Sequence, residues 1–342
     1  MSEGADRRRF FSDFLRDAVG AVREVNEAIR TGVEPELDQD EQELPLPARP
    51  TERALRTEEL PALCEEAGLA TRSAKIGELA RTSLRLTRAE PEYRASGRSR
   101  LGGAPDLPAG FEWPRRDVKE LAFLGQLDLA EVAALEPKAP LPGRGLLLFF
   151  YDVAGQPSGV APSHRGSCRV VLVDEDPSRL APAGADRACF SEYPLHLSLE
   201  LMLPRSWSPA VEALDLDPDE MAAWDELREK LARAQGVELE ELTPSWQSLH
   251  RLLGYPEELG SGMELDCQLA SGDMSVEADE SYVDPPGEEL EARAADWRLL
   301  LQLSNDEELG ASWGEGFGRL SLMIREQDLH ARAFDGVWAI VR

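Results

Sequence analysis

The sequence predicts an α+β fold made of internally duplicated, mostly antiparallel β units with flanking helices. An apolar, strand-like run that contains a lone glutamine occurs twice, over residues 121–127 and 299–303. Each copy is followed by a glycine-marked turn and a second apolar run, over 146–151 and 320–324. Such a repeat indicates two similar sheet units that share a core. Strand-like segments outnumber helix-like ones without a regular β-α-β rhythm, which favours α+β over a doubly wound sheet.

The N-terminal segment predicts an amphipathic helix over residues 7–30. Its apolar residues recur in alternating steps of four and three, which places them in one stripe of a helix. The stripe consists of Phe11, Leu15, Ala18, Val22, Val25 and Ile29. Docking on the protein's own body, self-association, contact with a membrane surface and docking on a partner all remain open for this helix. An export signal is disfavoured, because charged residues rather than an apolar core follow the arginines at 7–9.

A flexible linker is expected over residues 31–56, followed by one α+β domain over 57–342. The linker is acidic and proline-bearing, with almost nothing apolar to pack. Residues 57–89 are expected to form a short helical lead-in, with helices over Glu59–Leu69 and Ser73–Leu84.

The remaining elements follow from periodicity and from turn residues. Leucines at 195, 197, 199 and 201 alternate with more polar residues, the period of a strand with one buried face. A helix is expected over 218–235, with Asp217 as its N-cap, Pro218 in its first turn and Glu220 completing a capping box. Further expected elements are a strand at 169–173, a helix over Ser245–Leu253, a surface loop over 271–290, a short helix near 327–332 and a last strand at 337–341.

Charge restricts the class of partner. The formal net charge is −28, and residues 210–300 hold 24 Asp and Glu against 6 Lys and Arg. Such a surface repels nucleic acid and anionic membranes and favours a basic protein partner, although a merely well-solvated surface would look the same. The candidate partner face consists of Asp215, Asp219, Asp225, Glu229, Glu238 and Glu240.

The cellular setting is expected to be cytoplasmic. No run of 18 apolar residues is present, so no transmembrane helix is expected. The four cysteines are far apart, without a Cys-x-x-Cys pair, which is typical of a reducing compartment.

Several motifs in the last two thirds of the chain occur in the same order as in the YwqG-like bacterial family and resemble it. They are Ser99–Pro108 with Trp113-Pro114, Phe123–Leu127, Gly145–Tyr151, Leu252–Pro256, Leu300-Leu301-Gln302 and Trp313-Gly314. The resemblance covers about residues 90–342 and implies an α+β fold with internally similar halves and no established activity. Some members lie near toxin systems, which implies a conceivable immunity-like binding role. The chain departs from the family where Leu322-Met323 replace paired aromatics, and where Glu257-Glu258 replace a glutamine after Gly-Tyr-Pro.

Motifs for metal, cofactor and nucleophile chemistry are weak, and no cofactor, metal site or catalytic residue is expected. The four histidines lack ligand spacing. Asp215, Asp217, Asp219 and Glu226 imitate a calcium loop, but Glu220 stands where that loop needs glycine, so a helix start is the better interpretation. Loop carboxylates at 315, 328 and 335 could form an acid/base pair, although solvated side chains explain them more simply.

The glutamines are the most specific candidates. Gln126 and Gln302 each need partners for one carbonyl and two N–H donors. They either clamp irregular Gly/Pro loops or act as ligand contacts in a cleft, together with Trp113, Trp313 and Glu315. We therefore expect a non-enzymatic binding or regulatory protein, with an enzyme of unknown class in a cleft between the repeats as the alternative.

Overall fold

The structure is a computed structural model, and it describes residues 55–89, 97–236, 250–257, 262–274, 288–314 and 318–342. The helix expected over 7–30 and the linker expected over 31–56, apart from its last two residues, lie outside these ranges. The described residues combine helices with antiparallel sheets, which confirms the predicted α+β class. None of the described helices combines the length with the apolar composition that a membrane span requires.

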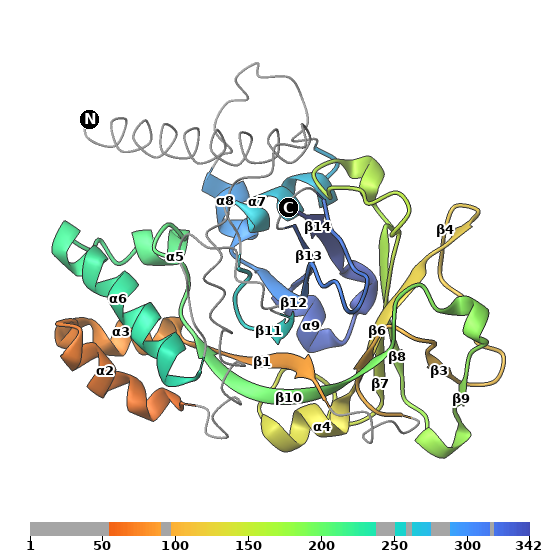
Figure 1. The fold of residues 1–342 in the computed structure, drawn as a ribbon. Helices are drawn as coiled ribbons and strands as arrows, with labels where there is room; N and C mark the ends of the chain where they lie inside the picture. Colours follow the sequence, from red (N-terminus) through yellow and green to blue (C-terminus); the bar gives the residue numbers. More distant parts are fainter. Residues whose placement is uncertain (1–54, 90–96, 237–249, 258–261, 275–287, 315–317) are drawn as a thin grey trace, which may run out of the picture. The chain divides into compact units, whose positions relative to one another are not determined.

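One ten-stranded antiparallel sheet dominates the described residues (Figure 1). Its strands, in spatial order, are β14 (Trp338–Val341), β13 (Arg319–Arg325), β12 (Trp297–Ser304), β11 (His250–Leu253), β1 (Arg81–Arg88), β10 (Tyr193–Met202), β2 (Arg100–Leu101), β6 (Ala122–Asp128), β7 (Leu146–Tyr151) and β8 (Cys168–Val173). Two small sheets pair β3 (Asp106–Leu107) with β9 (Ala181–Pro182) and β4 (Arg115–Arg116) with β5 (Lys119–Glu120).

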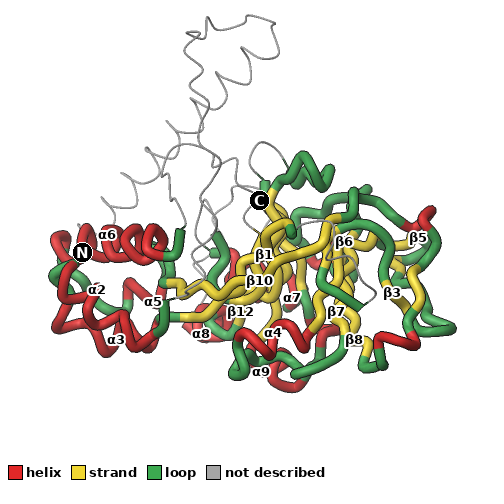
Figure 2. Tube along the Cα trace, turned by 60° about the horizontal axis from the view of Figure 1, so that its bottom comes forward, coloured by secondary structure: helices red, strands yellow, loops and turns green. Residues whose placement is uncertain are grey.

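The described helices lie around this sheet. They are α2 (Leu60–Glu66), α3 (Ser73–Leu79), α4 (Leu129–Leu135), α5 (Pro209–Glu212), α6 (Pro218–Ala234), α7 (Met263–Ser271), α8 (Glu288–Ala294) and α9 (Glu326–Ala331). Short 3₁₀ turns are η1 (Thr57–Glu59), η2 (Ala70–Arg72), η4 (Pro162–His164), η5 (Pro177–Arg179), η6 (Ala185–Arg187) and η7 (Phe334–Gly336). Helices α2, α3, α5 and α6 gather at one end of β1 and β10, as Figures 1 and 2 both show, and share an apolar cluster with Leu201 of β10.

The helix predicted over Ser73–Leu84 extends too far: its last part, residues 80–84, is not helical. Helix α3 ends at Leu79, and β1 begins at Arg81. Along β1 the fully buried Leu84 and Leu86 alternate with polar residues, the period of a strand. β1 lies between β10 and β11, so its backbone is hydrogen-bonded on both edges, and this pairing outweighs any local preference for helix.

The helix predicted over Ser245–Leu253 is wrong where the structure describes it. Residues 250–253 form β11, which pairs with β1 on one side and with β12 on the other. All four residues of β11 are buried, so this short segment lacks the alternation of buried and exposed residues that would distinguish a strand from a helix. The strands predicted at 169–173 and through 195–201 and the helix predicted over 218–235 are confirmed as β8, β10 and α6.

Apolar side chains are buried on both faces of the sheet. Leu127 of β6 and Leu303 of β12 belong to one cluster of buried side chains. We call it the shared core, because it contains residues from both halves of the sheet, the half that includes β6 and the half that includes β12. Each half also has a separate cluster on its other face, containing Phe123 in one half and Leu299 in the other. Trp313 is fully buried in the shared core.

A loop after β7 covers the edge strand β14. The Ser158 carbonyl accepts a hydrogen bond from the Val341 amide at 3.0 Å, and the Gly159 carbonyl accepts one from Trp338 Nε1 at 2.7 Å. Gly159 has a φ of +89°, and a Cβ at this position would lie 2.0 Å from the Ala339 carbonyl oxygen. Only glycine fits, and the contact protects an edge that could otherwise pair with another chain.

The start of α6 is the predicted capping box. Asp217 Oδ1 accepts hydrogen bonds from the amides of Asp219 and Glu220 at 2.9 and 2.8 Å. Glu220 accepts one in return from the Asp217 amide at 3.2 Å. The Asp217 and Glu220 carboxylates are therefore used by the helix backbone, as the sequence predicted.

Candidate functional site

Gln126 fixes the turn that follows β2. Its side chain is fully buried, and its Oε1 accepts a hydrogen bond from the Asp106 amide at 2.9 Å. Its Nε2 donates to the Asp106 carboxylate at 2.9 Å and to the Arg98 carbonyl at 3.0 Å. Arg100, opposite Gln126 in the ladder, donates to the same carboxylate at 2.9 Å. Both polar atoms of the amide are thus engaged. We call Arg100, Asp106 and Gln126 the first centre.

Gln302 has the corresponding position in the other half of the sheet. It is fully buried on β12 and lies opposite Arg251 of β11. Its Oε1 accepts a hydrogen bond from the Glu257 amide at 2.8 Å. We call Arg251, Glu257 and Gln302 the second centre. The structure therefore places the two glutamines in separate centres, one in each half.

The two centres share a sequence pattern that lies outside the glutamine-bearing runs. Residues 100–106 read Arg-Leu-Gly-Gly-Ala-Pro-Asp, and residues 251–257 read Arg-Leu-Leu-Gly-Tyr-Pro-Glu. The third residue of each segment, Gly102 or Leu253, has a φ of +63°. A direct comparison of the two segments would have identified the arginine and the acid as partners of each glutamine.

The ladders around the glutamines also match. The register of β6 shifts between Phe123 and Gly125, and that of β12 shifts between Leu299 and Leu301. Each irregularity ends one residue before the glutamine. A bulge at this point turns the glutamine away from the shared core, because one extra residue reverses the alternation of side chains.

The two centres differ in how many hydrogen bonds they make. Gln302 Nε2 makes no hydrogen bond in the described structure, whereas Gln126 Nε2 makes two. Ser321, opposite Gln302 on β13, is 1% exposed, and its Oγ also has no hydrogen-bond partner there. The residue opposite Gln126 on β7 is Leu148, which needs none. Buried polar groups without a partner are rare in native proteins, so these two call for an explanation.

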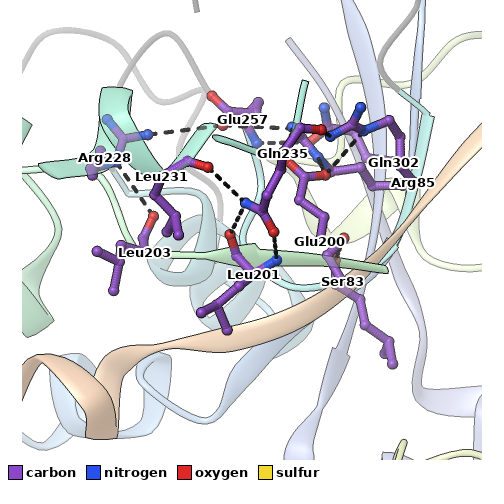
Figure 3. Close-up of polar contacts among 12 residues, drawn as sticks. Ser83, Arg85, Glu200, Leu201, Leu203, Arg228, Leu231, Gln235, Glu257 and Gln302 are labelled. Carbon is purple, nitrogen blue, oxygen red and sulfur yellow. Dashed lines mark hydrogen bonds and ion pairs between the residues drawn. The ribbon is translucent and has the colours of Figure 1, made fainter. Parts of the chain in front are cut away.

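Several arginines lie near the second centre, and Figure 3 labels two of them, Arg85 and Arg228, with Glu257 and Gln302. Arg251 is 1% exposed and binds Glu200 through Nε and Nη2, at 3.2 and 3.1 Å. Its Nη1 lies 3.7 Å from the Glu257 carboxylate. Arg85, opposite Arg251 on β1, lies 3.6 Å from Glu200. Two guanidinium groups and two carboxylates therefore meet on one buried face of the sheet.

Three further arginines reach Glu257 from other elements. Arg205 binds its carboxylate directly, and Arg228 of α6 lies 3.9 Å from it. Arg319 of β13 donates to the Glu257 carbonyl at 2.6 Å. Within the described residues, the set that we call the arginine cluster is Arg85, Arg205, Arg228, Arg251 and Arg319, with the carboxylates of Glu200 and Glu257. The cluster carries five positive charges against two negative ones.

The electrostatics of the cluster show how strongly these groups interact. Burial alone would raise the pKa of Glu257, but Arg205, Arg251 and Arg228 lower it to about 2. Burial lowers the pKa of Arg85 and Arg228. Arginine does not lose its proton in proteins, so all five guanidinium groups remain cationic.

The other predicted cleft residues lie apart from the second centre. Trp113 is half-buried, donates to the Leu121 carbonyl at 2.8 Å and packs on Phe150 with the ring centroids 5.3 Å apart. Trp313, in the shared core, donates to the Ser304 carbonyl at 3.2 Å. Glu315 lies outside the described residues.

The predicted acidic face is described in part. Asp215 and Asp219 are exposed, and Asp225 and Glu229 are half-buried along α6. Glu229 forms an ion pair with Arg233 one turn later. Glu238 and Glu240 lie outside the described residues.

A buried histidine beside the second centre resembles a catalytic residue but is fully engaged. His250 Nε2 lies 3.0 Å from the Asp306 carboxylate, and its Nδ1 accepts a hydrogen bond from the Ser304 amide at 3.3 Å. Tyr193 donates to the same carboxylate at 2.8 Å. Burial opposes ionisation of Asp306, yet these hydrogen bonds hold its pKa well below the usual range. Neither ring nitrogen is left to accept a proton from a substrate.

An open groove of about 1250 Å³ lies over β1 and β10. Leu84, Leu197 and Leu199 are among its apolar lining residues, and Arg81 and Glu326 are among its charged ones. Neither Gln126 nor Gln302 lines it. Within the described ranges, no group of three or more His, Cys, Asp or Glu side chains is arranged to hold a metal ion.

Comparison with known proteins gives a family without an assigned function. Residues 99–342, more than half of the chain, match the family model described as "Domain of unknown function (DUF1963)". No curated protein matches the chain.

Proposed function

Since the chain belongs to this family of unknown function, we propose from its geometry that it is a non-catalytic binding and regulatory protein. In this proposal the acidic face of α6 meets a basic partner protein.

The separation of charges on α6 carries the proposal. Arg228 points into the protein, where it donates to the Leu203 carbonyl and lies near Glu257 (Figure 3). Of the five carboxylates on the helix, Glu220, Glu226 and Glu229 form ion pairs with Arg72, Lys230 and Arg233, which leaves Asp219 and Asp225 as the surplus. The outer side of the helix therefore carries a surplus of carboxylates, whereas its inner side, with Arg228, is cationic.

Such a surface favours a basic partner through long-range attraction. Charges on a protein surface steer an oppositely charged partner over about one Debye length, roughly 8 Å at physiological salt. This effect raises the association rate more than it lowers the dissociation rate. Partner capture should therefore depend steeply on salt.

The state of the buried reactive groups supports binding over the alternative of an enzyme. The His250 ring has both nitrogens engaged. Burial raises the pKa of the Cys168 thiol to about 12, which makes it a poor nucleophile. The finer parts of the proposal are an internal duplication, supported by the matching centres, membership of the YwqG-like bacterial group, an immunity-like role and a cytoplasmic location.

The test neutralises the face without changing its shape. A variant with Asp215→Asn, Asp219→Asn, Asp225→Asn and Glu229→Gln removes four negative charges, and asparagine tolerates the positive φ of Asp215. A matched control removes four exposed carboxylates elsewhere, with Glu65→Gln, Glu112→Gln, Glu175→Gln and Glu307→Gln.

Pull-down from the native host, read by mass spectrometry, should identify a basic protein whose association slows as salt rises. The α6 variant should capture it several-fold more slowly, and the control should behave like wild type. Equal capture by the two variants, or binding that does not change with salt, would refute a role for this face.

A further inference from the structure

We propose that the second centre binds a small, doubly charged tetrahedral oxyanion of the phosphate class. The proposal goes beyond the partner-binding role proposed above and does not depend on it. It is based on the contrast between the two centres and on the charge of the arginine cluster.

The first argument is charge. Five guanidinium groups face two carboxylates in the cluster, in a protein whose overall net charge is −28. Buried charges are normally paired, because removing an ion from water without a partner is costly. A divalent anion would offset most of the local positive surplus.

The second argument is the set of hydrogen-bond donors that remain unused. Nε of Arg85, Arg205 and Arg319 and Nη1 of Arg251 are buried and make no hydrogen bond in the described structure. Of these, Arg85 Nε lies 3.6 Å from Glu200 and Arg251 Nη1 lies 3.7 Å from Glu257, so each faces a carboxylate only at ion-pair distance. Gln302 Nε2 and Ser321 Oγ add an amide and a hydroxyl. Phosphate oxygens are acceptors only, and the fork of a guanidinium group matches them in geometry.

The third argument is that these groups adjoin one another in the sheet. Arg85, Arg251, Gln302 and Ser321 are successive partners across β1, β11, β12 and β13. Neighbouring strands lie about 5 Å apart, so side chains of one row on one face are neighbours. Arg319, two residues from Ser321 on β13, points to the same face.

The first centre shows what the same arrangement looks like without a ligand site. There Asp106 takes the Gln126 amide and Nη1 of Arg100, and Leu148 stands in place of Ser321. The Nε of Arg100 makes no hydrogen bond among the described residues but lies 3.8 Å from the Glu192 carboxylate. Arg85 lies opposite Arg251 in the second centre, whereas Pro194 of β10 lies opposite Arg100 in the first. The second centre therefore has donors, on Arg85 and Ser321, at positions where the first centre has Pro194 and Leu148.

Two arginines of the cluster lie nearer the solvent than Arg251 does. The Arg205 side chain is 26% exposed and Arg319 is partly exposed, whereas Arg251 and Gln302 lie fully inside. An anion would enter past Arg205 and Arg319 and meet Arg251, Gln302 and Ser321 at the inner end.

The test is a titration of the full-length protein with inorganic phosphate, at constant ionic strength and with chloride as the reference. We expect saturable heat in calorimetry and a rise in melting temperature. Methyl phosphate forms a second arm. Equal binding of methyl phosphate would assign the site to the phosphate group of a larger molecule, and selective binding of inorganic phosphate would assign it to the free ion.

Three variants locate the binding. Ser321→Ala should leave the melting temperature unchanged without phosphate and weaken binding by about tenfold, the loss of one hydrogen bond. Gln302→Glu keeps an acceptor for the Glu257 amide and places a negative charge among the arginines, so it should abolish binding. Gln126→Glu is the matched control: it should destabilise the first centre through repulsion from Asp106 and still bind phosphate.

Wild-type protein that gives no saturable response to millimolar phosphate would overturn the proposal. Binding that is unchanged in both Ser321→Ala and Gln302→Glu would overturn it as well, because the anion would then lie elsewhere.

Discussion

Replacing each glutamine by leucine tests whether the two centres differ in energy as they do in geometry. Gln126→Leu and Gln302→Leu remove the same amide from equivalent positions and leave apolar side chains of similar volume. Both residues are fully buried, and their hydrogen bonds are buried too, except for the part-buried one to the Arg98 carbonyl.

The magnitudes follow from the hydrogen bonds. Gln126→Leu removes three, to the Asp106 amide, the Asp106 carboxylate and the Arg98 carbonyl. The carboxylate keeps Arg100 and the Gly97 amide, so two backbone groups lose their partner. At about 1–3 kcal/mol for each such group, the free energy of unfolding should fall by roughly 2–6 kcal/mol.

Gln302→Leu should cost much less. It removes one hydrogen bond, from the Glu257 amide, and it also removes a buried N–H group that has no partner. The two effects oppose each other, so the expected loss is about 0–2 kcal/mol.

Urea unfolding in phosphate-free buffer, followed by tryptophan fluorescence and circular dichroism, measures both values. Phosphate must be absent because a bound anion would raise the cost of Gln302→Leu by mass action. Equal losses, or a greater loss for Gln302→Leu, would refute the view that the first centre is closed and the second is open.

Three other predictions concern charge, packing and the N-terminal segment. Glu257→Gln should lower the free energy of unfolding by about 3 kcal/mol at pH 7. Because the pKa of Glu257 lies below its ordinary value, this difference from wild type should shrink as pH falls from about 4.5 towards 2. A difference that does not depend on pH in urea titrations would contradict this. Gly159→Ala should cost more than about 3 kcal/mol, because its Cβ would meet the Ala339 carbonyl, whereas Gly166→Ala, which also has a positive φ but open space, should cost about 1–2 kcal/mol in the same assay. Removal of residues 1–52 should leave the melting temperature almost unchanged, because an acidic, proline-bearing linker separates residues 7–30 from the domain; a loss of several degrees in calorimetry would show that this segment belongs to the core.

The sequence predicted the elements whose pattern is local. The alternation through 195–201 identified β10, and Asp217, Pro218 and Glu220 identified the start of α6. In both cases the residues that decide the structure are neighbours along the chain, so periodicity and capping rules apply directly.

Elements that depend on distant partners were predicted less well. β11 has only four residues and is held by β1 on one side and β12 on the other, so nothing local distinguished it from the end of a helix. The two glutamines were recognised as unusual from their apolar surroundings. Their arginine and acid partners come from other strands and turns, and the unused donors around Gln302 depend on the three-dimensional arrangement alone.

The position of β1 has a practical consequence for how the domain is delimited. The family match begins at residue 99, yet β1, at Arg81–Arg88, lies in the middle of the ten-stranded sheet. A fragment cut at the family boundary would lose this strand and expose the backbone of β10 and β11 as two open edges, which invite pairing between molecules and aggregation. During synthesis β1 emerges first but must wait for β10 and then β11, so the centre of the sheet is completed only after residue 253 has left the ribosome.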